Sequence, residues 1–315
     1  MTNTLKMGTR GSALALAQAR QFAATLEFFH PGLGVEEHII RTTGDKNQGS
    51  PLPEIGGKGV FTLEIEAALL GGDIDFAVHS LKDLPPTMPD GLILACVPPR
   101  EVPADCLILN PTLSEDEGFK GELSFLPLGA KVGTSSLRRR AMLLHLRPDL
   151  QIEDVRGNID TRLRKLQDEN FAAIVLARAG LNRLEVEGVR AHNLPESWFV
   201  PAPGQGALAI QARADDLDTR SILLALQDEA TRSAVEAERA VVAELGAGCS
   251  TPLGAIARAY GDTISLHATV LSPDGKARVA VSLQGSGAPA LIGQRAARSL
   301  LEKGAGELLG RQNAL

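Results

Sequence analysis

The hydrophobic pattern predicts the same order of elements twice along the chain. Residues 5–29, LKMGTRGSALALAQARQFAATLEFF, are typical of a short strand, a Gly-Thr turn and a helix that ends before Pro31. Residues 130–147, AKVGTSSLRRRAMLLHLR, repeat this pattern, and their helix ends before Pro148. A strand, an amphipathic helix and an apolar strand follow in each half.

Strand, helix, strand, helix and strand in this order predict two α/β domains with largely parallel sheets. The apolar strands are DIDFAVHS (73–80) and FAAIVLARAG (171–180), and polar residues follow both of them. Ligands of such sheets bind beyond the carboxyl ends of the strands, so we expect a site in a cleft between the two halves.

The last third of the chain predicts a different, smaller α+β region. Residues 200–213, VPAPGQGALAIQAR, resemble a crossover that returns to one of the sheets. Beyond it, Asp228 is a plausible N-cap for an amphipathic helix that ends at Gly246. The remaining elements are three strand-like runs and a closing helix: 253–260, 263–272, 277–285 and 289–309.

Composition narrows the class of protein. A chain of 315 residues can form two or three domains, and 3% aromatic residues make stacking on nucleic-acid bases an improbable binding mode. Cys96, Cys106 and Cys249 are too widely spaced for a zinc site or a disulfide framework. The sequence shows neither a signal peptide nor a membrane span, so the cytoplasm is the expected compartment.

Seven arginines fall between Arg138 and Arg164, although the whole chain has a net charge of −6. Residues 131–190 carry 12 Lys and Arg against 8 Asp and Glu, a local charge of +4. Such a local cluster favours a small ligand with several negative charges over a nucleic acid, which requires a broad basic face. The alternative is a set of solvated helix faces with ordinary ion pairs.

Hydroxyl side chains precede both of the repeated helices. Thr9 and Ser12 precede the first helix, and Thr134, Ser135 and Ser136 precede the second. Free N–H groups at a helix N-terminus bind anions. Capping alone needs one hydroxyl per helix, and three hydroxyls beside Arg138 and Arg139 exceed that need.

The segment HSLKDLP, residues 79–85, follows an apolar strand. Near arginines Asp83 would stay ionised, and it could stabilise a cationic intermediate or handle a proton. The alternative is a surface pair of Lys82 and Asp83 of little energetic value. His79 is either part of this site or, more commonly for such a position, a core histidine.

Cys249 lies just beyond a predicted helix C-terminus, where the helix dipole disfavours a thiolate. This position argues against a protease-type nucleophile. Two interpretations of Cys249 stay open: a small apolar residue of the core, or a permanent attachment point.

Cys96 and Cys106 lie in apolar strand-like runs and are interpreted as structural. GGKG at 56–59 and GQG at 204–206 lack the spacing of nucleotide-binding loops, and no metal site is expected.

Eight segments, taken together and in this order, closely resemble the porphobilinogen deaminase (hydroxymethylbilane synthase) family of tetrapyrrole biosynthesis. They are GTRGSALALAQ, GGKGVF, HSLKDLP, VGTSSLRR, VRGNIDTRL, LARAGLNRL, PAPGQGALAI and LGAGCSTPLGA. The resemblance implies a transferase that deaminates porphobilinogen and joins four molecules head to tail on a dipyrromethane primer. Hydrolysis then releases linear hydroxymethylbilane.

The resemblance also implies two type II periplasmic-binding-protein-like α/β lobes and a small C-terminal α+β domain. The expected boundaries are 1–104 with 203–222, 105–202, and 223–315. A dipyrromethane cofactor is expected on Cys249 through a thioether. Porphobilinogen is the expected small-molecule partner, a monomer is expected, and neither nucleic-acid nor membrane contacts are expected. Whether a downstream synthase docks on the protein stays open.

Residue roles follow from the matching motif positions. Asp83 matches the family's catalytic aspartate, which contacts the pyrrole N–H groups, assists departure of the amine and stabilises the positively charged methylenepyrrolenine. The expected cofactor-binding residues are Cys249, Ser80, Lys82, Asp83, Thr134, Ser135, Ser136, Arg138, Arg139, Arg156 and Gly157. The expected substrate-binding residues are Arg10, Ser12, Gln18, Arg156, Arg162 and Arg183.

Two positions depart from the family pattern. Glu54 and Ser250 stand where other residues are common in the family, and the acidic segment 111–128 is interpreted as a surface insertion.

Two other classes of protein compete with this family. A non-catalytic anion-binding protein of the periplasmic-binding type would have similar lobes but no need for Cys249 or Asp83. A ligand-sensing domain of a transcription regulator would need a DNA-binding module.

Overall fold

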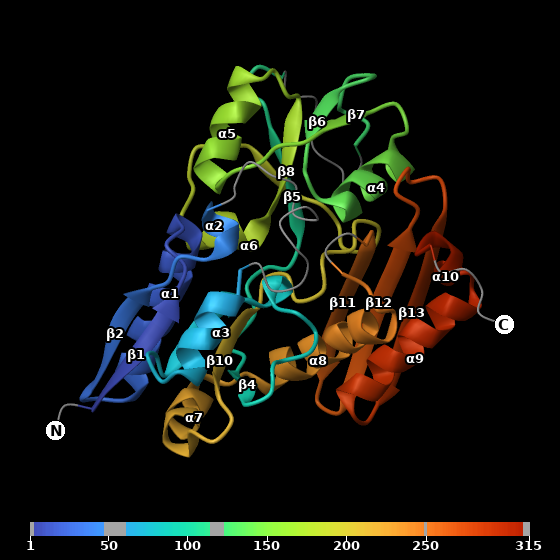
Figure 1. The fold of residues 1–315 in the computed structure, drawn as a ribbon. Coiled ribbons are helices and arrows are strands. Elements are labelled where there is room, and N and C mark those ends of the chain that lie inside the picture. The colour runs from blue at the N-terminus through green and yellow to red at the C-terminus, as the bar shows by residue number, and fades with distance from the viewer. Residues whose placement is uncertain (1–2, 47–60, 114–122, 249–250, 311–315) are drawn as a thin grey trace. The chain divides into compact units, whose positions relative to one another are not determined.

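A computed structural model describes residues 3–46, 61–113, 123–248 and 251–310 of the chain (Figure 1). The chain divides into two compact units, which are described one at a time. The first unit contains Met1–Glu101 and Gly206–Arg232, and the second contains Val102–Gln205 and Ser233–Leu315. None of the helices in these ranges is both long and apolar enough to span a membrane.

A five-stranded sheet in the order β2-β1-β3-β10-β4 forms the centre of the first unit. Its strands are β1 (Asn3–Thr9), β2 (Leu33–Ile39), β3 (Phe76–Ser80), β4 (Leu92–Cys96) and β10 (Leu208–Arg213). The helical elements are α1 (Ala13–Phe29), α2 (Thr43–Lys46), α3 (Leu63–Leu70), η2 (Leu81–Asp83), α7 (Leu217–Leu223) and η3 (Leu224–Leu226). Strand β10 confirms that residues 200–213 return to a sheet.

Alternation along β3 explains why helices cover both faces of this sheet. Phe76 and Val78 belong to a core cluster with Phe22 of α1, whereas Ala77 packs in another cluster with Leu69 of α3. Successive strand residues point to opposite faces, so a fully apolar strand needs cover on both sides. The buried pattern of β3 meets this requirement.

The second unit contains a sheet with the corresponding order, β7-β6-β8-β5-β9. Its strands are β5 (Asp105–Leu109), β6 (Lys131–Gly133), β7 (Gln151–Glu153), β8 (Ala173–Ala177) and β9 (Ala191–Asn193). Helices α4 (Leu137–Leu146), α5 (Ile159–Asp168) and α6 (Arg178–Arg183) pack against it.

The fourth strand in the order of each sheet runs antiparallel to both of its neighbours. This strand is β10 in the first unit and β5 in the second. The other four strands of each sheet run parallel, so the prediction of largely parallel sheets is confirmed. Each antiparallel strand comes from a segment that connects the two halves in sequence. The duplicated order of elements therefore has the same topology in both halves.

A three-stranded antiparallel sheet, β11 (Leu253–Tyr260), β12 (Thr263–Leu271) and β13 (Arg278–Ser286), also belongs to the second unit. Helix α8 (Glu229–Glu244) precedes it, and α9 (Pro289–Glu302) and α10 (Ala305–Leu308) follow. The Asp228 carboxylate accepts a hydrogen bond from Thr231 N at 2.7 Å, which confirms the predicted N-cap. The predicted fold class, two α/β sheets with a small C-terminal α+β part, is confirmed.

One predicted element is wrong in detail, and the domain boundaries remain predictions. The single closing helix over 289–309 is two helices, because Gly304 adopts a φ of 95° between α9 and α10. This left-handed conformation interrupts the helical backbone and suits glycine. The expected three-domain boundaries of 1–104 with 203–222, 105–202 and 223–315 stay a prediction.

Candidate active site

The first unit brings Gln18 and Ser80 together at the carboxyl end of β3. Gln18 Nε2 donates to Ser80 Oγ at 3.1 Å, and the Gln18 side chain is buried within α1. Ser12 is the N-cap of the same helix, and its Oγ accepts from Ala15 N at 3.3 Å. These contacts join the helix that follows β1 to the end of β3.

Arg10 lies just beyond β1 and is held on two sides. Its Nε donates to Asp45 Oδ1 at 3.2 Å, and its guanidinium lies 4.2 Å from the centre of the Phe61 ring. Burial by itself raises the pKa of Asp45, but hydrogen bonds from Arg10 and Thr42 outweigh burial and hold the pKa below its usual value. Asp45, which was not predicted from the sequence, therefore holds the Arg10 guanidinium in place through an ion pair.

Lys82 and Asp83 lie in the single turn η2, directly after β3. Leu81 is buried beside them, and its N–H donates to Ala207 O at 3.0 Å. The side chains of Lys82 and Asp83 are exposed. A buried leucine thus anchors the turn and leaves the Asp83 carboxylate accessible from solvent.

His79 is buried in β3, as expected for a core histidine, but its Nε2 has no hydrogen-bond partner among the described residues. Burial lowers the pKa of His79 to about 4, the nearby Gln211 side chain partly opposes this effect, and the charge of Arg10 lowers the pKa further. The imidazole is therefore neutral at physiological pH.

We expect His79 to make the protein sensitive to acid. Below its ordinary pKa of 6.5 the unfolded state binds a proton that the folded state does not bind until about pH 4. The free energy of unfolding should therefore fall by roughly 3 kcal/mol over this range. Urea unfolding at several pH values should show a shallower decline for His79→Gln, and an unchanged decline would contradict the buried, neutral state of His79.

The second unit places three hydroxyl residues at the beginning of α4. Ser136 is the N-cap, and its Oγ accepts from Arg139 N at 3.4 Å. Thr134 Oγ1 accepts from Ser136 N at 3.2 Å, and Ser135 Oγ donates to Val155 O at 3.0 Å. All three hydroxyls therefore order the loop from which α4 begins.

Arg138 and Arg139 belong to the first turn of α4, and both side chains are buried against Asp105. Arg138 Nη1 donates to Asp105 Oδ2 at 2.6 Å, and Arg139 Nε donates to Asp105 Oδ1 at 2.8 Å. Asp105 was not among the residues predicted from the sequence, where its only local signal is an acidic residue at the beginning of the apolar run DCLIL.

The remaining predicted residues of this unit lie around α5 and α6. Arg162 Nε donates to Gly157 O at 2.7 Å, while Arg156 forms a 3.3 Å ion pair with Asp154. Gly157 has a φ of 113°, and a Cβ there would lie 2.8 Å from Thr161, so the position favours glycine. Arg183, at the end of α6, is partly exposed.

Burial and the nearby charge of Arg139 lower the pKa of Arg162 to about 10. The guanidinium still carries its charge at neutral pH. The repulsion indicates that Arg139 and Arg162 raise the positive potential in the same region of the second unit. An anionic ligand would relieve this repulsion.

The predicted residues thus form two sets, one in each unit. The set in the first unit contains Arg10, Ser12, Gln18, Ser80, Lys82 and Asp83. The set in the second unit contains Thr134, Ser135, Ser136, Arg138, Arg139, Arg156, Gly157, Arg162 and Arg183. The shared cleft stays a prediction. Cys249, Ser250, Glu54 and the GGKG segment lie outside the described residues.

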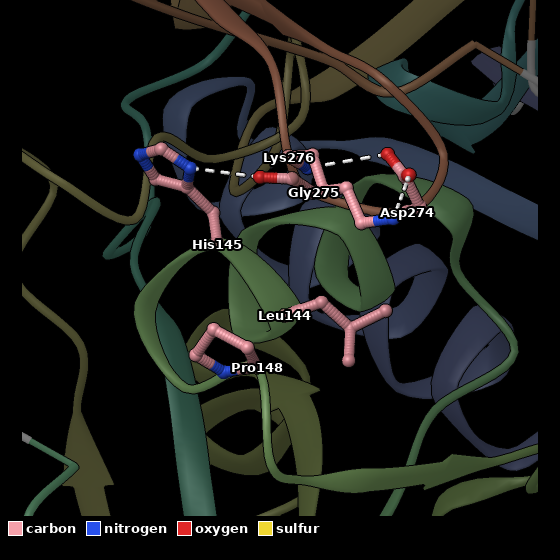
Figure 2. A pocket seen from close by; sticks show the side chains of 6 residues that line it. All are labelled: Leu144, His145, Pro148, Asp274, Gly275 and Lys276. Carbon is pink, nitrogen blue, oxygen red and sulfur yellow. Dashed lines mark hydrogen bonds and ion pairs between the residues drawn. The ribbon is translucent and has the colours of Figure 1, made fainter.

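A pocket of about 360 Å³ in the second unit contains none of these residues (Figure 2). It lies between the end of α4 and the turn that joins β12 to β13, where His145 Nδ1 is 2.8 Å from Gly275 O. The predicted chemistry therefore does not depend on this pocket.

Comparison with known protein families decides the relationship. Residues 5–221 match the family model described as "Porphobilinogen deaminase, dipyromethane cofactor binding domain". Residues 233–302 match "Porphobilinogen deaminase, C-terminal domain". The chain belongs to the porphobilinogen deaminase family. The resemblance inferred from the eight sequence motifs is thereby confirmed.

Individual deaminases agree with this family over nearly the whole chain. The porphobilinogen deaminase of Brevibacillus brevis is 46% identical over 96% of this chain and 96% of its own length. That of Syntrophobacter fumaroxidans is 44% identical over 97% and 96%, respectively. Among solved structures, the methionine-binding protein MetQ is 16% identical with a TM-score of 0.41, covering 74% of this chain and 93% of its own.

Proposed function

We propose that the protein is a porphobilinogen deaminase (hydroxymethylbilane synthase, EC 2.5.1.61). It joins four porphobilinogen molecules head to tail on a dipyrromethane primer and releases the linear product by hydrolysis. The two matches to deaminase family models, over residues 5–221 and 233–302, carry this conclusion. Its substrate is porphobilinogen.

The donor groups of the second unit fit a cofactor that carries several carboxylates. Two buried guanidiniums, Arg138 and Arg139, meet a single carboxylate, Asp105, and the charged Arg162 adds to the positive potential. Arginine is suited to carboxylates because its planar fork donates two parallel hydrogen bonds. We assign cofactor binding to these two α4 arginines, the hydroxyls that precede them, and Ser80, Lys82, Arg156 and Gly157.

Each addition breaks the bond between the aminomethyl carbon of porphobilinogen and its nitrogen, and ammonia leaves. A new carbon–carbon bond then forms to a free pyrrole α-carbon, which loses its proton. When bound, dipyrromethane supplies the first such α-carbon. Four porphobilinogen molecules and one water molecule thus give hydroxymethylbilane and four molecules of ammonia.

Asp83 is the residue to which we assign the catalytic role. Its carboxylate is exposed on a turn that a buried leucine anchors. There it can accept hydrogen bonds from pyrrole N–H groups and stabilise the positive charge that develops when ammonia leaves. A carboxylate at a fixed position performs this task without covalent bonding to the substrate.

Substrate binding is assigned to Arg10, Ser12, Gln18, Arg156, Arg162 and Arg183. Arg10 is already oriented by Asp45 and the Phe61 ring, so a substrate carboxylate would meet a guanidinium of fixed position. The acetate and propionate arms of porphobilinogen provide such carboxylates.

Cys249 is the proposed attachment point of the cofactor, through a thioether. Support comes from the other two cysteines, both of which are buried in strands. Burial raises the pKa of both the Cys96 and the Cys106 thiol to about 12, so neither forms a thiolate readily. We also propose that the enzyme is a cytoplasmic monomer, in line with the expectation from its sequence.

Purified protein incubated with porphobilinogen should release one ammonia for each porphobilinogen consumed. One linear tetrapyrrole should appear for every four molecules. Ammonia can be measured by a coupled assay and the tetrapyrrole by absorbance after oxidation. Binding of porphobilinogen without release of ammonia would contradict the proposed function and favour a non-catalytic binding protein.

A further inference from the structure

A single buried carboxylate organises both arginines of α4 in the second unit. Asp105, the first residue of β5, is 0% exposed. Its Oδ1 accepts from Arg139 Nε at 2.8 Å and from Gln205 Nε2 at 3.0 Å, and Arg139 Nη2 lies 2.7 Å from the same oxygen in an ion pair. Its Oδ2 accepts from Arg138 Nη1 at 2.6 Å. Donors therefore engage both oxygens.

Backbone carbonyl groups fix the two guanidiniums from other directions. Arg138 Nη1 also donates to Val200 O at 2.7 Å, and Arg139 Nη1 donates to Val175 O at 3.0 Å. Gln205 is itself buried and donates to Pro103 O at 2.7 Å. The guanidinium plane of each arginine is therefore held in one orientation, by the Asp105 carboxylate and by one backbone carbonyl group.

The charges of this network do not balance. Burial alone raises the pKa of Asp105, but the charges of Arg138 and Arg139 outweigh burial and hold the pKa well below its usual value. One anion therefore faces two buried cations. A network built for stability alone has no need of the second cation, because buried ion pairs often stabilise a fold no more than well-packed apolar side chains of similar volume. A ligand carboxylate would supply the missing negative charge.

We propose that Asp105 is a positioning residue, which holds Arg138 and Arg139 in the orientation that accepts a carboxylate of the dipyrromethane cofactor. This inference rests on the proposed function. Asp105 does not touch the cofactor in this role and acts through the two arginines. Gln205 assists by holding one oxygen of the Asp105 carboxylate.

Cofactor loading of the full chain tests this role separately from turnover. Protein made in a host without porphobilinogen is incubated with increasing porphobilinogen, and the fraction that gains the cofactor is followed by intact mass. We expect Asp105→Asn to raise the half-saturating concentration about tenfold, the effect of losing one hydrogen bond between charged groups. Gln205→Met should raise it about threefold, because the charge of Asp105 stays in place.

Glu238→Gln provides the matched control. Glu238 is also buried in the second unit, but its carboxylate accepts from the backbone N–H groups of Gly204 and Ala257. We expect this variant to lower the melting temperature while its half-saturating concentration stays near that of the unchanged protein. A combined Asp105→Asn, Arg139→Gln variant should show less than the sum of the two separate losses, measured on folded protein.

The outcomes separate this inference from the proposed function. If the unchanged protein gains no mass, the proposed function is wrong. If the unchanged protein loads normally and Asp105→Asn loads at the same concentration, only the positioning role is overturned. If Asp105→Asn does not fold, Gln205→Met decides, and a half-saturating concentration equal to that of the unchanged protein overturns the proposal.

Discussion

Asp83→Asn is expected to lower kcat by about 10²- to 10⁴-fold, the usual contribution of a group that manages charge or protons in the transition state. Asparagine has nearly the same shape but carries no negative charge. It can still contact the substrate, but it cannot balance the cation that forms when ammonia leaves. Because the Asp83 side chain is exposed, the free energy of unfolding should change by no more than about 0.5 kcal/mol.

Asp90→Asn is the matched control, since Asp90 is another exposed aspartate of the first unit. Initial rates of porphobilinogen consumption, together with intact mass, distinguish the two variants. Asp83→Asn should retain the cofactor mass and turn over slowly, whereas Asp90→Asn should match the unchanged protein. Equal rates for the two variants would remove Asp83 from its assigned role.

Cys249→Ser is expected to abolish activity, because a serine hydroxyl is a much weaker nucleophile than a cysteine thiol and should not form the link to the cofactor. The purified variant should have the mass of the bare polypeptide. Cys96→Ala and Cys106→Ala serve as controls and should keep the additional mass, since both thiols are buried in sheets of the two lobes. A Cys249→Ser variant that still carries the cofactor would show that the attachment point lies elsewhere.

The order of elements could be predicted because it depends on local patterns. Alternation and apolar runs identify strands such as β3 and β8, and proline marks the ends of α1 and α4. The repeated pattern correctly indicated two lobes of the same type. The return of residues 200–213 to one of the sheets could also be predicted, because a Pro- and Gly-rich turn precedes an apolar strand.

The partners of the arginines could not be predicted, because they come from distant parts of the sequence. Asp105 is more than thirty positions away from both Arg138 and Arg139, and Gln205 is 100 positions away from Asp105. No local periodicity encodes such contacts. Asp45 was missed for the same reason, since it meets Arg10 only after β1 and β2 pair in the sheet.

The break between α9 and α10 shows a different limit. The periodicity of apolar positions continues through residues 289–309, and the presence of Gly304 alone does not predict that the helix ends there. The backbone at Gly304 adopts a φ of 95°, in the left-handed region, between α9 and α10. Glycine permits this conformation without requiring it.

We propose that this chain lengthens a primer that is covalently bound to it. The most direct measurement is the intact mass of the purified protein after addition of a small excess of porphobilinogen. We expect a starting mass above that of the polypeptide by one dipyrromethane, followed by species that increase in steps of one porphobilinogen less one ammonia. A protein that keeps the mass of the bare polypeptide throughout and still converts porphobilinogen at the full rate would rule out a covalently bound primer.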